Sequence, residues 1–159
     1  MSKRIVLLQA LASTPNDLRL MVQSLPANLV HQRPDPDNWS IAEILCHLID
    51  IEARYRQRLY TVVHEGNPSL PALHPDETQY NEKATLDELL HQFGTAREVT
   101  VAFLQELSMK QWQRPAVHAN WGATTLRYLV QQLVDHDINH LNQAVETQQQ
   151  LKKIVKRET

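Results

Sequence analysis

Helical periodicity is the feature that most constrains how this chain can fold. Through four long segments, apolar residues recur at intervals of three and four, which places them on one face of a helix. The chain holds only three glycines and few runs of β-branched residues, and we identify no credible strand in it. Its 159 residues suit one domain around a single core. We therefore predict an all-α fold, a four-helix bundle that forms a single domain over residues 1–159.

The first predicted helical region covers residues 3–25 and contains a break. Thr14 is suited to the N-cap of a helix, and Pro15 to the first helical position, where an N–H would have no partner inside the helix. We therefore expect one helix to end near Thr14 and a second to begin at Pro15.

Capping signals mark the other predicted helices. Ser40 with Glu43, and Thr85 with Glu88, each form the pattern of a capping box before an apolar helix. Gly66 is expected to end the helix that Ser40 opens. The predicted helices cover residues 40–64, residues 85–107 and, starting near Ala123 or Thr124, a last segment to about residue 153.

A long connection separates the second and third of these helices. Residues 66–83 hold three prolines and show no periodicity. Such a segment could extend for ~55 Å, whereas a 24-residue helix is only ~35 Å long. The connection could therefore run the whole length of a bundle and let the two helices lie parallel. A loop that simply projects into solvent is the alternative.

A faint internal repeat agrees with this crossover. Residues 32–40 (QRPDPDNWS) resemble residues 113–122 (QRPAVHANWG), and each copy follows one helix and precedes another. Two helical halves joined by a long loop would give the bundle pseudo-twofold character, although two matches this short could also be coincidence. Trp39 and Trp121, which occupy equivalent places in the two copies, are expected to be anchors of the core.

A histidine interrupts the apolar face of the helix predicted over residues 40–64. His47 lies three residues after Ile44 and four before Ile51, so the three side chains share one side of the helix. Taken alone, such a histidine is more often a structural residue bonded to a backbone carbonyl than a ligand.

The last predicted helix changes this interpretation of His47. Its core-facing stripe contains His136 and His140, four residues apart, so both rings can reach one point beside the helix. Burying three imidazoles without a common partner would be costly. A metal ion would bind one nitrogen of each ring, while the second nitrogens could donate to carboxylates such as Asp50 or Glu43. We therefore predict His47, His136 and His140 as metal ligands.

Rival patterns are weaker. Residues 136–140 (HDINH) imitate the H-E-x-x-H motif of metalloproteases, but Asp137 is one methylene shorter than the glutamate that activates water there. Glu88 and His91 have the Glu-x-x-His spacing of di-iron bundles, which require a second such pair that we do not find. Cys46 points away from His47 around the helix and is expected to be a small buried hydrophobe.

The order of the motifs resembles a known family. A Trp-Ser pair opens a helix, His47 follows the Trp by eight residues, a Pro-rich crossover comes next, and His136 and His140 form His-x-x-x-His on the last long helix. This order resembles the DinB-like (YfiT-like) metal-binding four-helix bundles over nearly the whole chain. The resemblance implies the three histidines as metal ligands, a long crossover between helices two and three, short extra helical turns and a possible homodimer.

The resemblance implies the site more firmly than the reaction. The family includes thiol-dependent transferases and isomerases that use bacillithiol, mycothiol or glutathione, and proteins proposed to be metal-dependent hydrolases. We therefore expect a metal-dependent thiol transferase or hydrolase that acts on small molecules. A non-catalytic, stress-associated or ligand-binding bundle with a structural or vestigial metal is the alternative.

Three neutral ligands would leave a divalent ion its full charge and an open position for water or a thiol. Imidazoles suit zinc and nickel equally, and a low-molecular-weight thiol is a second possible cofactor. Asp50 and Gln132, one turn from His47 and His136, are weak candidates for proton handling. His74 and His118 are expected at the surface, where they could also line the rim of the site.

Composition excludes several partners and compartments. The net charge of −2 indicates no basic face for nucleic acid, and no run of apolar residues is long enough to span a membrane. A single cysteine cannot form an internal disulfide and fits a reducing compartment. We expect a cytoplasmic protein whose partner is a small-molecule substrate.

Overall fold

The computed structural model describes residues 2–74 and 78–158. Within these residues the elements follow one another in this order: α1 (Lys3–Val22), η1 (Ala27–Leu29), α2 (Ile41–His64), β1 (Ser69–Leu70), α3 (Leu86–Glu106), α4 (Met109–Trp112), β2 (Pro115–His118), β3 (Gly122–Thr125) and α5 (Leu126–Glu158).

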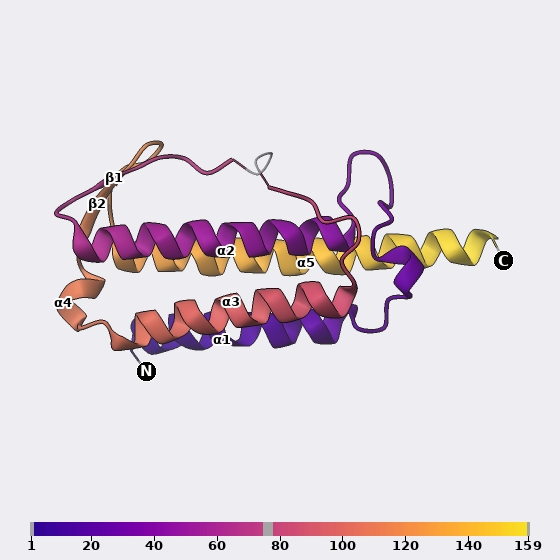
Figure 1. Ribbon diagram of the computed structural model, residues 1–159, viewed down its shortest axis with the longest axis horizontal. Helices are drawn as coiled ribbons and strands as arrows, with labels where there is room; N and C mark the ends of the chain where they lie inside the picture. Colours follow the sequence, from indigo (N-terminus) through magenta and orange to yellow (C-terminus); the bar gives the residue numbers. More distant parts are fainter. Residues whose placement is uncertain (1, 75–77, 159) are drawn as a thin grey trace.

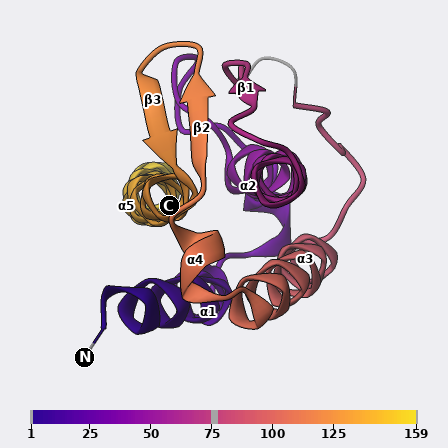
Figure 2. The same cartoon turned by 90° about the vertical axis from the view of Figure 1, so that its left-hand side faces the viewer.

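The four long helices form a bundle with an uncommon order of directions. Figures 1 and 2 show α2 beside α3 and running the same way, while α1 and α5 run the opposite way on the neighbouring sides. The connection from α2 to α3 returns along the length of the bundle in Figure 1. The predicted four-helix bundle with a long crossover is therefore confirmed.

The ends of α2 follow from specific backbone partners. Ser40 and Glu43 form the predicted capping box, in which each side chain accepts from the other residue's backbone N–H. At the other end the expected glycine cap is wrong, because Gly66 does not adopt a positive φ and Asn67 does, at 53°. Arg114 instead donates to the carbonyl groups of Val62 and Glu65, so a side chain from a distant segment satisfies the end of the helix.

The break predicted near Thr14 is wrong, because α1 continues through Pro15. A proline inside a helix leaves the carbonyl four residues earlier without its N–H donor. Here that carbonyl belongs to Leu11, and it accepts a hydrogen bond of 2.9 Å from Nη1 of Arg97 on α3. The third helix thus supplies the donor that Pro15 lacks, and the helix need not end.

A small sheet replaces what was expected to be loop. β2 pairs with β3 as an antiparallel hairpin, and β1 from the crossover adds to β2 in parallel. Gly122 provides the positive φ, 73°, at the hairpin. Strands of two to four residues are too short to show alternation in sequence, so the prediction of no strand is wrong. The hairpin also delays the last helix, which begins at Leu126 rather than near Ala123.

Arg97 joins all four helices of the bundle inside the core. Its side chain is buried, with the whole residue only 1% exposed. It donates to Oε2 of Glu52 on α2 at 2.8 and 3.0 Å, and to both carboxylate oxygens of Asp137 on α5 at 2.6 and 2.9 Å. Together with its bond to Leu11 on α1, these contacts make one residue of α3 the common partner of three other helices.

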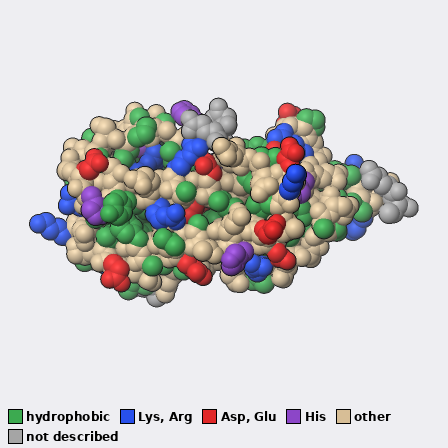
Figure 3. All heavy atoms as spheres, viewed as in Figure 1, with side chains coloured by type: hydrophobic (Ala, Val, Ile, Leu, Met, Phe, Trp, Pro, Cys, Tyr) green, Lys and Arg blue, Asp and Glu red, His purple; other side chains and the backbone are tan. Residues whose placement is uncertain are grey.

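The surface is mixed in character. On the face shown in Figure 3, acidic and basic side chains are interspersed among apolar ones over the helices. In the described part of the chain, no helix combines the length and the apolarity that a membrane crossing requires.

We expect Arg97→Met to lower the free energy of unfolding by about 3–5 kcal/mol, because it leaves two buried carboxylates without their counter-charge. Urea denaturation followed by circular dichroism measures this loss. Arg19→Met is the control, since Arg19 pairs with Asp87 only at the surface, and it should cost less than about 1 kcal/mol. A similar, small loss for both variants would show that the network does not stabilise the bundle.

Candidate metal centre

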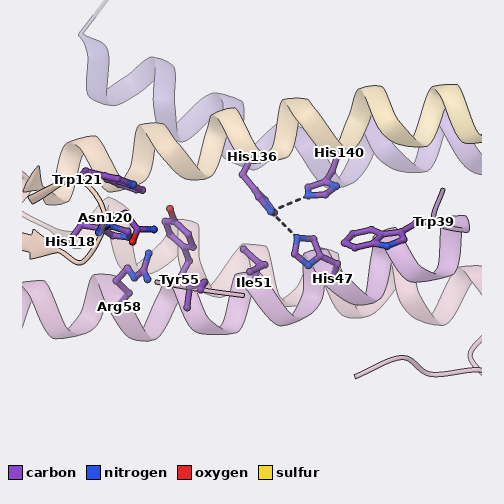
Figure 4. A pocket seen from close by; sticks show the side chains of 11 residues that line it. Trp39, His47, Ile51, Tyr55, Arg58, His118, Asn120, Trp121, His136 and His140 are labelled. Carbon is purple, nitrogen blue, oxygen red and sulfur yellow. Dashed lines mark hydrogen bonds between the residues drawn. The ribbon is translucent and has the colours of Figure 1, made fainter. Parts of the chain in front are cut away.

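The structure brings the three predicted histidines together between α2 and α5. His47 comes from α2, and His136 and His140 come from successive turns of α5 (Figure 4). Nε2 of His136 lies 3.0 Å from Nε2 of His47 and 3.1 Å from Nε2 of His140. One ring nitrogen of each residue lies within 4.8 Å of the other two, and no further His, Cys, Asp or Glu of the described residues joins the cluster.

Hydrogen bonds determine which nitrogen of His47 carries the proton. Its Nδ1 lies 3.3 Å from the hydroxyl oxygen of Thr78, and the Thr78 hydroxyl donates to Oδ2 of Asp50 at 3.2 Å. Because a hydroxyl has only one proton to donate, Thr78 must accept from Nδ1–H of His47. Nε2 of His47 therefore carries no proton, and its lone pair faces the other two rings.

His140 is oriented in the same way from its own helix. Its Nδ1 lies 2.7 Å from Oε1 of Gln143, an oxygen that can only accept, so Nδ1 of His140 carries the proton. Nε2 of His140 therefore carries no proton, and its lone pair faces His136. The indole of Trp39 lies parallel to the His140 ring, with ring centroids 6.1 Å apart, and covers this end of the site.

Burial keeps the three rings neutral at pH 7. Burial, followed by the repulsion of the neighbouring His140, lowers the pKa of His47 to about 4. Burial, followed by the repulsion of His140 and His47, lowers the pKa of His136 to about 3. Burial also lowers the pKa of His140. Neutral imidazoles offer lone pairs, so a cation need not displace protons to bind.

The donor set fits a divalent metal ion. Ligands that share an ion at ~2.1 Å, with bond angles between about 90° and 109°, lie about 3.0–3.4 Å apart. The separations of 3.0 and 3.1 Å around His136 agree with this spacing. Nδ1 of His136 is buried and has no hydrogen-bond partner among the described residues, so its ring is held by packing and by whatever Nε2 binds.

The site lies at one end of a groove of about 410 Å³. Beyond the histidines the groove continues past Ile51 to a second group of polar residues near the small sheet (Figure 4). Trp39 and Trp121 line it at opposite ends, and Trp121 is 44% exposed. The prediction that both are core anchors is therefore wrong for Trp121, which the hairpin places at the rim of the groove.

Sequence comparison agrees with this architecture. The sequence model of the DinB superfamily matches residues 10–144, which is most of the chain. The chain belongs to the DinB superfamily. No curated protein sequence matches it.

Two solved structures from Bacillus subtilis share the fold of this DinB superfamily member. YfiT, described as a probable metal-dependent hydrolase with an unusual four-helix bundle topology, has a TM-score of 0.83 at 18% identity, covering 96% of this chain and 90% of that one. The DinB-like protein YjoA has a TM-score of 0.62 at 20% identity, covering 92% of each chain. At these identities the likeness establishes the fold alone.

The other candidates named from the sequence have separate positions. Asp50 is linked to His47 by hydrogen bonds through Thr78 and also pairs with Arg54 at 3.0 Å. Gln132 is half-buried and is not among the described residues that line the groove. His74 is exposed, as expected.

Two rival patterns and one histidine are also accounted for. Asp137 of the HDINH pattern is bound to Arg97, so it is no general base, and Glu88 caps its own helix. His91 is exposed. His118, expected at the surface, is buried and lines the far end of the groove.

Sequence reasoning missed the two residues that orient the imidazoles. Gln143 could have been found, since it lies three residues after His140 and therefore on the same side of the helix. Thr78 carries no such signal, because it lies in the crossover, 31 residues from His47 in sequence.

We expect His47→Ala and His136→Ala each to abolish stoichiometric binding of a divalent metal. Metal that binds only the folded state stabilises it by about 2.7 kcal/mol at a hundredfold excess over the dissociation constant, so both variants should also melt lower in zinc-replete buffer. Metal content by mass spectrometry of protein without a His tag measures the first effect. His74→Ala and His118→Ala should retain one equivalent. One tightly bound equivalent in His47→Ala would make His47 a core histidine only.

We expect Thr78→Val and Gln143→Leu to weaken metal binding by about 10–100-fold, because each removes the acceptor that holds a ring in its ligating tautomer. Competition with a chromophoric chelator for zinc measures the affinity. Thr61→Val is the control on α2, since the Thr61 hydroxyl donates to the carbonyl of Gln57 within the same helix. Wild-type affinity in both test variants would contradict the assigned tautomers.

Proposed function

We propose that this protein is a metal-dependent enzyme that acts on small molecules, with His47, His136 and His140 as the ligands of a divalent ion. One observation carries the proposal: three neutral imidazoles converge at the end of an open groove, and no carboxylate of the described residues joins them. Three neutral ligands with room beside them are typical of catalytic sites, whereas a fourth protein ligand closes a structural site.

A divalent ion held by the three rings would supply a positive charge and an open position that lower the pKa of a bound water or thiol. The protein's own residues have separate tasks. Thr78 and Gln143 hold the rings of His47 and His140 with their lone pairs inward. Trp39 covers the cluster on one side, and the groove leads away on the other.

Thiol transfer is the reaction that the groove favours. Its apolar middle and its length suit an organic co-substrate better than a water molecule alone. In this reaction the thiol loses its proton to solvent, and its sulfur forms a bond to an electrophilic carbon of the substrate. The leaving group departs with the electron pair of the bond that breaks. No carboxylate base is needed, which agrees with a groove that has none among the described residues lining it.

Hydrolysis is the second candidate. The observation in its favour is the fold shared with YfiT, which is described as a probable metal-dependent hydrolase. The groove that accepts an organic thiol would then accept an ester or an amide, and the attacking group would be water.

The identity of the metal ion is a separate question for both reactions. Three imidazoles favour neither zinc nor nickel over the other, so both ions belong in the tests.

We expect a thiol to bind directly to the metal if thiol transfer is the reaction. Adding millimolar bacillithiol, mycothiol or glutathione to the cobalt-substituted protein should produce a sulfur-to-metal charge-transfer band in the near ultraviolet. S-methylglutathione is the control, because its sulfur carries no proton to lose and cannot bind as a thiolate.

The same titration separates the candidates. Unchanged spectra with all three thiols, together with thiol-independent cleavage of ester or amide substrates by the metal-loaded protein, would favour hydrolysis. Unchanged spectra and no cleavage, in a protein that binds one equivalent of metal, would favour a non-catalytic bundle.

A further inference from the structure

The groove has a second polar end, well separated from the histidines. Arg58, His118 and Asn120 meet there beside the rings of Tyr55 and Trp121 (Figure 4). Arg58 follows His47 by eleven residues on α2, which corresponds to about 16 Å along the helix axis. None of these residues has a part in the metal centre.

Arg58 is a buried cation that has no counter-charge among the described residues. The residue is only 7% exposed, and no carboxylate among the described residues pairs with it. Its guanidinium donates to the carbonyl of Pro71. The guanidinium also lies over the ring of Tyr55, with Cζ of Arg58 5.2 Å from the ring centroid. The other deeply buried arginine, Arg97, has two carboxylates around it.

This difference points to a missing anion. A guanidinium stays protonated and has five N–H donors in a planar fork, which suits a carboxylate or a phosphate. Burying that charge without a partner carries a desolvation penalty, which the attraction of a bound anion offsets. Burial lowers the pKa of Arg58, in line with a cation that lacks a counter-charge.

His118 adds a donor beside Arg58. Its Nδ1 accepts a hydrogen bond of 3.1 Å from the backbone N–H of Asn120, so the proton of the neutral ring is on Nε2. The ring is buried and stacks on Trp121, with centroids 3.7 Å apart, which fixes its orientation. The far end therefore offers a guanidinium, an imidazole N–H and the side-chain amide of Asn120.

The middle of the groove is apolar. Ile51 and Tyr55 continue the stripe of α2 between His47 and Arg58, and Leu73 from the crossover also lines the groove. A ligand that spans the groove would thus meet lone pairs or metal at one end, hydrocarbon in the middle and N–H donors at the other end.

We infer that Arg58, His118 and Asn120 form a subsite for the anionic end of an elongated substrate whose reacting group lies at the three histidines. The inference rests on the proposed function and narrows it: the substrate or co-substrate carries a carboxylate or phosphate, separated by an apolar spacer from the group that reaches the metal. Arg58 supplies the charge, and His118 and Asn120 complete the donor set.

Matched thiols test the subsite on the cobalt-substituted protein. Mercaptoalkanoic acids with chains of about six to twelve carbons are compared with mercaptoalkanols of the same length, which lack the charge. The charge-transfer band gives each dissociation constant. The wild-type protein should bind the best acid about tenfold or more tightly than its alcohol, with an optimum at one chain length.

Two variants assign the preference to Arg58. Arg58→Met should bring the acid-to-alcohol ratio close to one, and a circular dichroism spectrum like that of the wild type shows that the variant is folded. Arg56→Met is the matched control, because it removes the same charge from the same helix, where Arg56 contacts the carbonyl of Ala96 on α3. It should keep the wild-type ratio. A ratio near one in the wild type, or an unchanged ratio in Arg58→Met, overturns the subsite.

Mercaptoalkyl phosphates of the same length identify the anion. Tighter binding of the phosphate or of the acid assigns the subsite to that group, and in either case Arg58→Met must remove the preference over the alcohol.

A separate measurement keeps the subsite distinguishable from the proposed reaction. If no thiol gives a band, thiol transfer fails, and the subsite is then tested with octanoate and octanol through quenching of tryptophan fluorescence, since Trp39 and Trp121 line the groove. A preference for octanoate that Arg58→Met abolishes supports the subsite; equal binding of both probes overturns it.

Discussion

The buried guanidinium of Arg97 is the interaction on which the rest of the structure depends. It stands on α3 and binds Leu11 of α1, Glu52 of α2 and Asp137 of α5, so it determines how the four helices sit relative to one another. Asp137 directly follows His136, and Glu52 lies just over one turn after His47. By holding these two carboxylates, Arg97 sets the register of α2 against α5. A metal site needs that register to within about half an ångström.

The groove follows from the topology. The crossover lets α2 run parallel to α3, and the chain reverses between α3 and α5, so α2 lies antiparallel to α5. Residues of these two helices line one long groove. The metal centre lies within this groove, and the small sheet closes its far end, where β1 from the crossover meets the hairpin of β2 and β3. The sheet is short, yet it places His118 and Trp121 against Arg58 of the helix. The same long connection thus accounts for the helix directions and for one end of the groove.

Much of the fold could be predicted because it depends on local signals. The capping boxes at Ser40 and Thr85 act within one helical turn, and both are present. Several errors share one cause, which is that a distant residue supplied what the local sequence lacked. Pro15 should have ended α1, but Arg97 satisfies the carbonyl that the proline leaves free. The strands β1 and β2 are formed by pairing between segments 48 residues apart, which no local pattern records.

The sequence by itself determined where the long apolar helices lie and that the three histidines stand on their apolar faces, because periodicity along a helix decides which side chains share a face. Only the tertiary structure decided what each buried polar group contacts. In the folded protein Thr78 hydrogen-bonds to His47, and Asp137 pairs with Arg97. Arg58 is buried and pairs with no carboxylate among the described residues. These outcomes differ because hydrogen bonding and charge pairing depend on segments that meet only after packing, whereas the apolar stripe of a helix is a property of the chain alone.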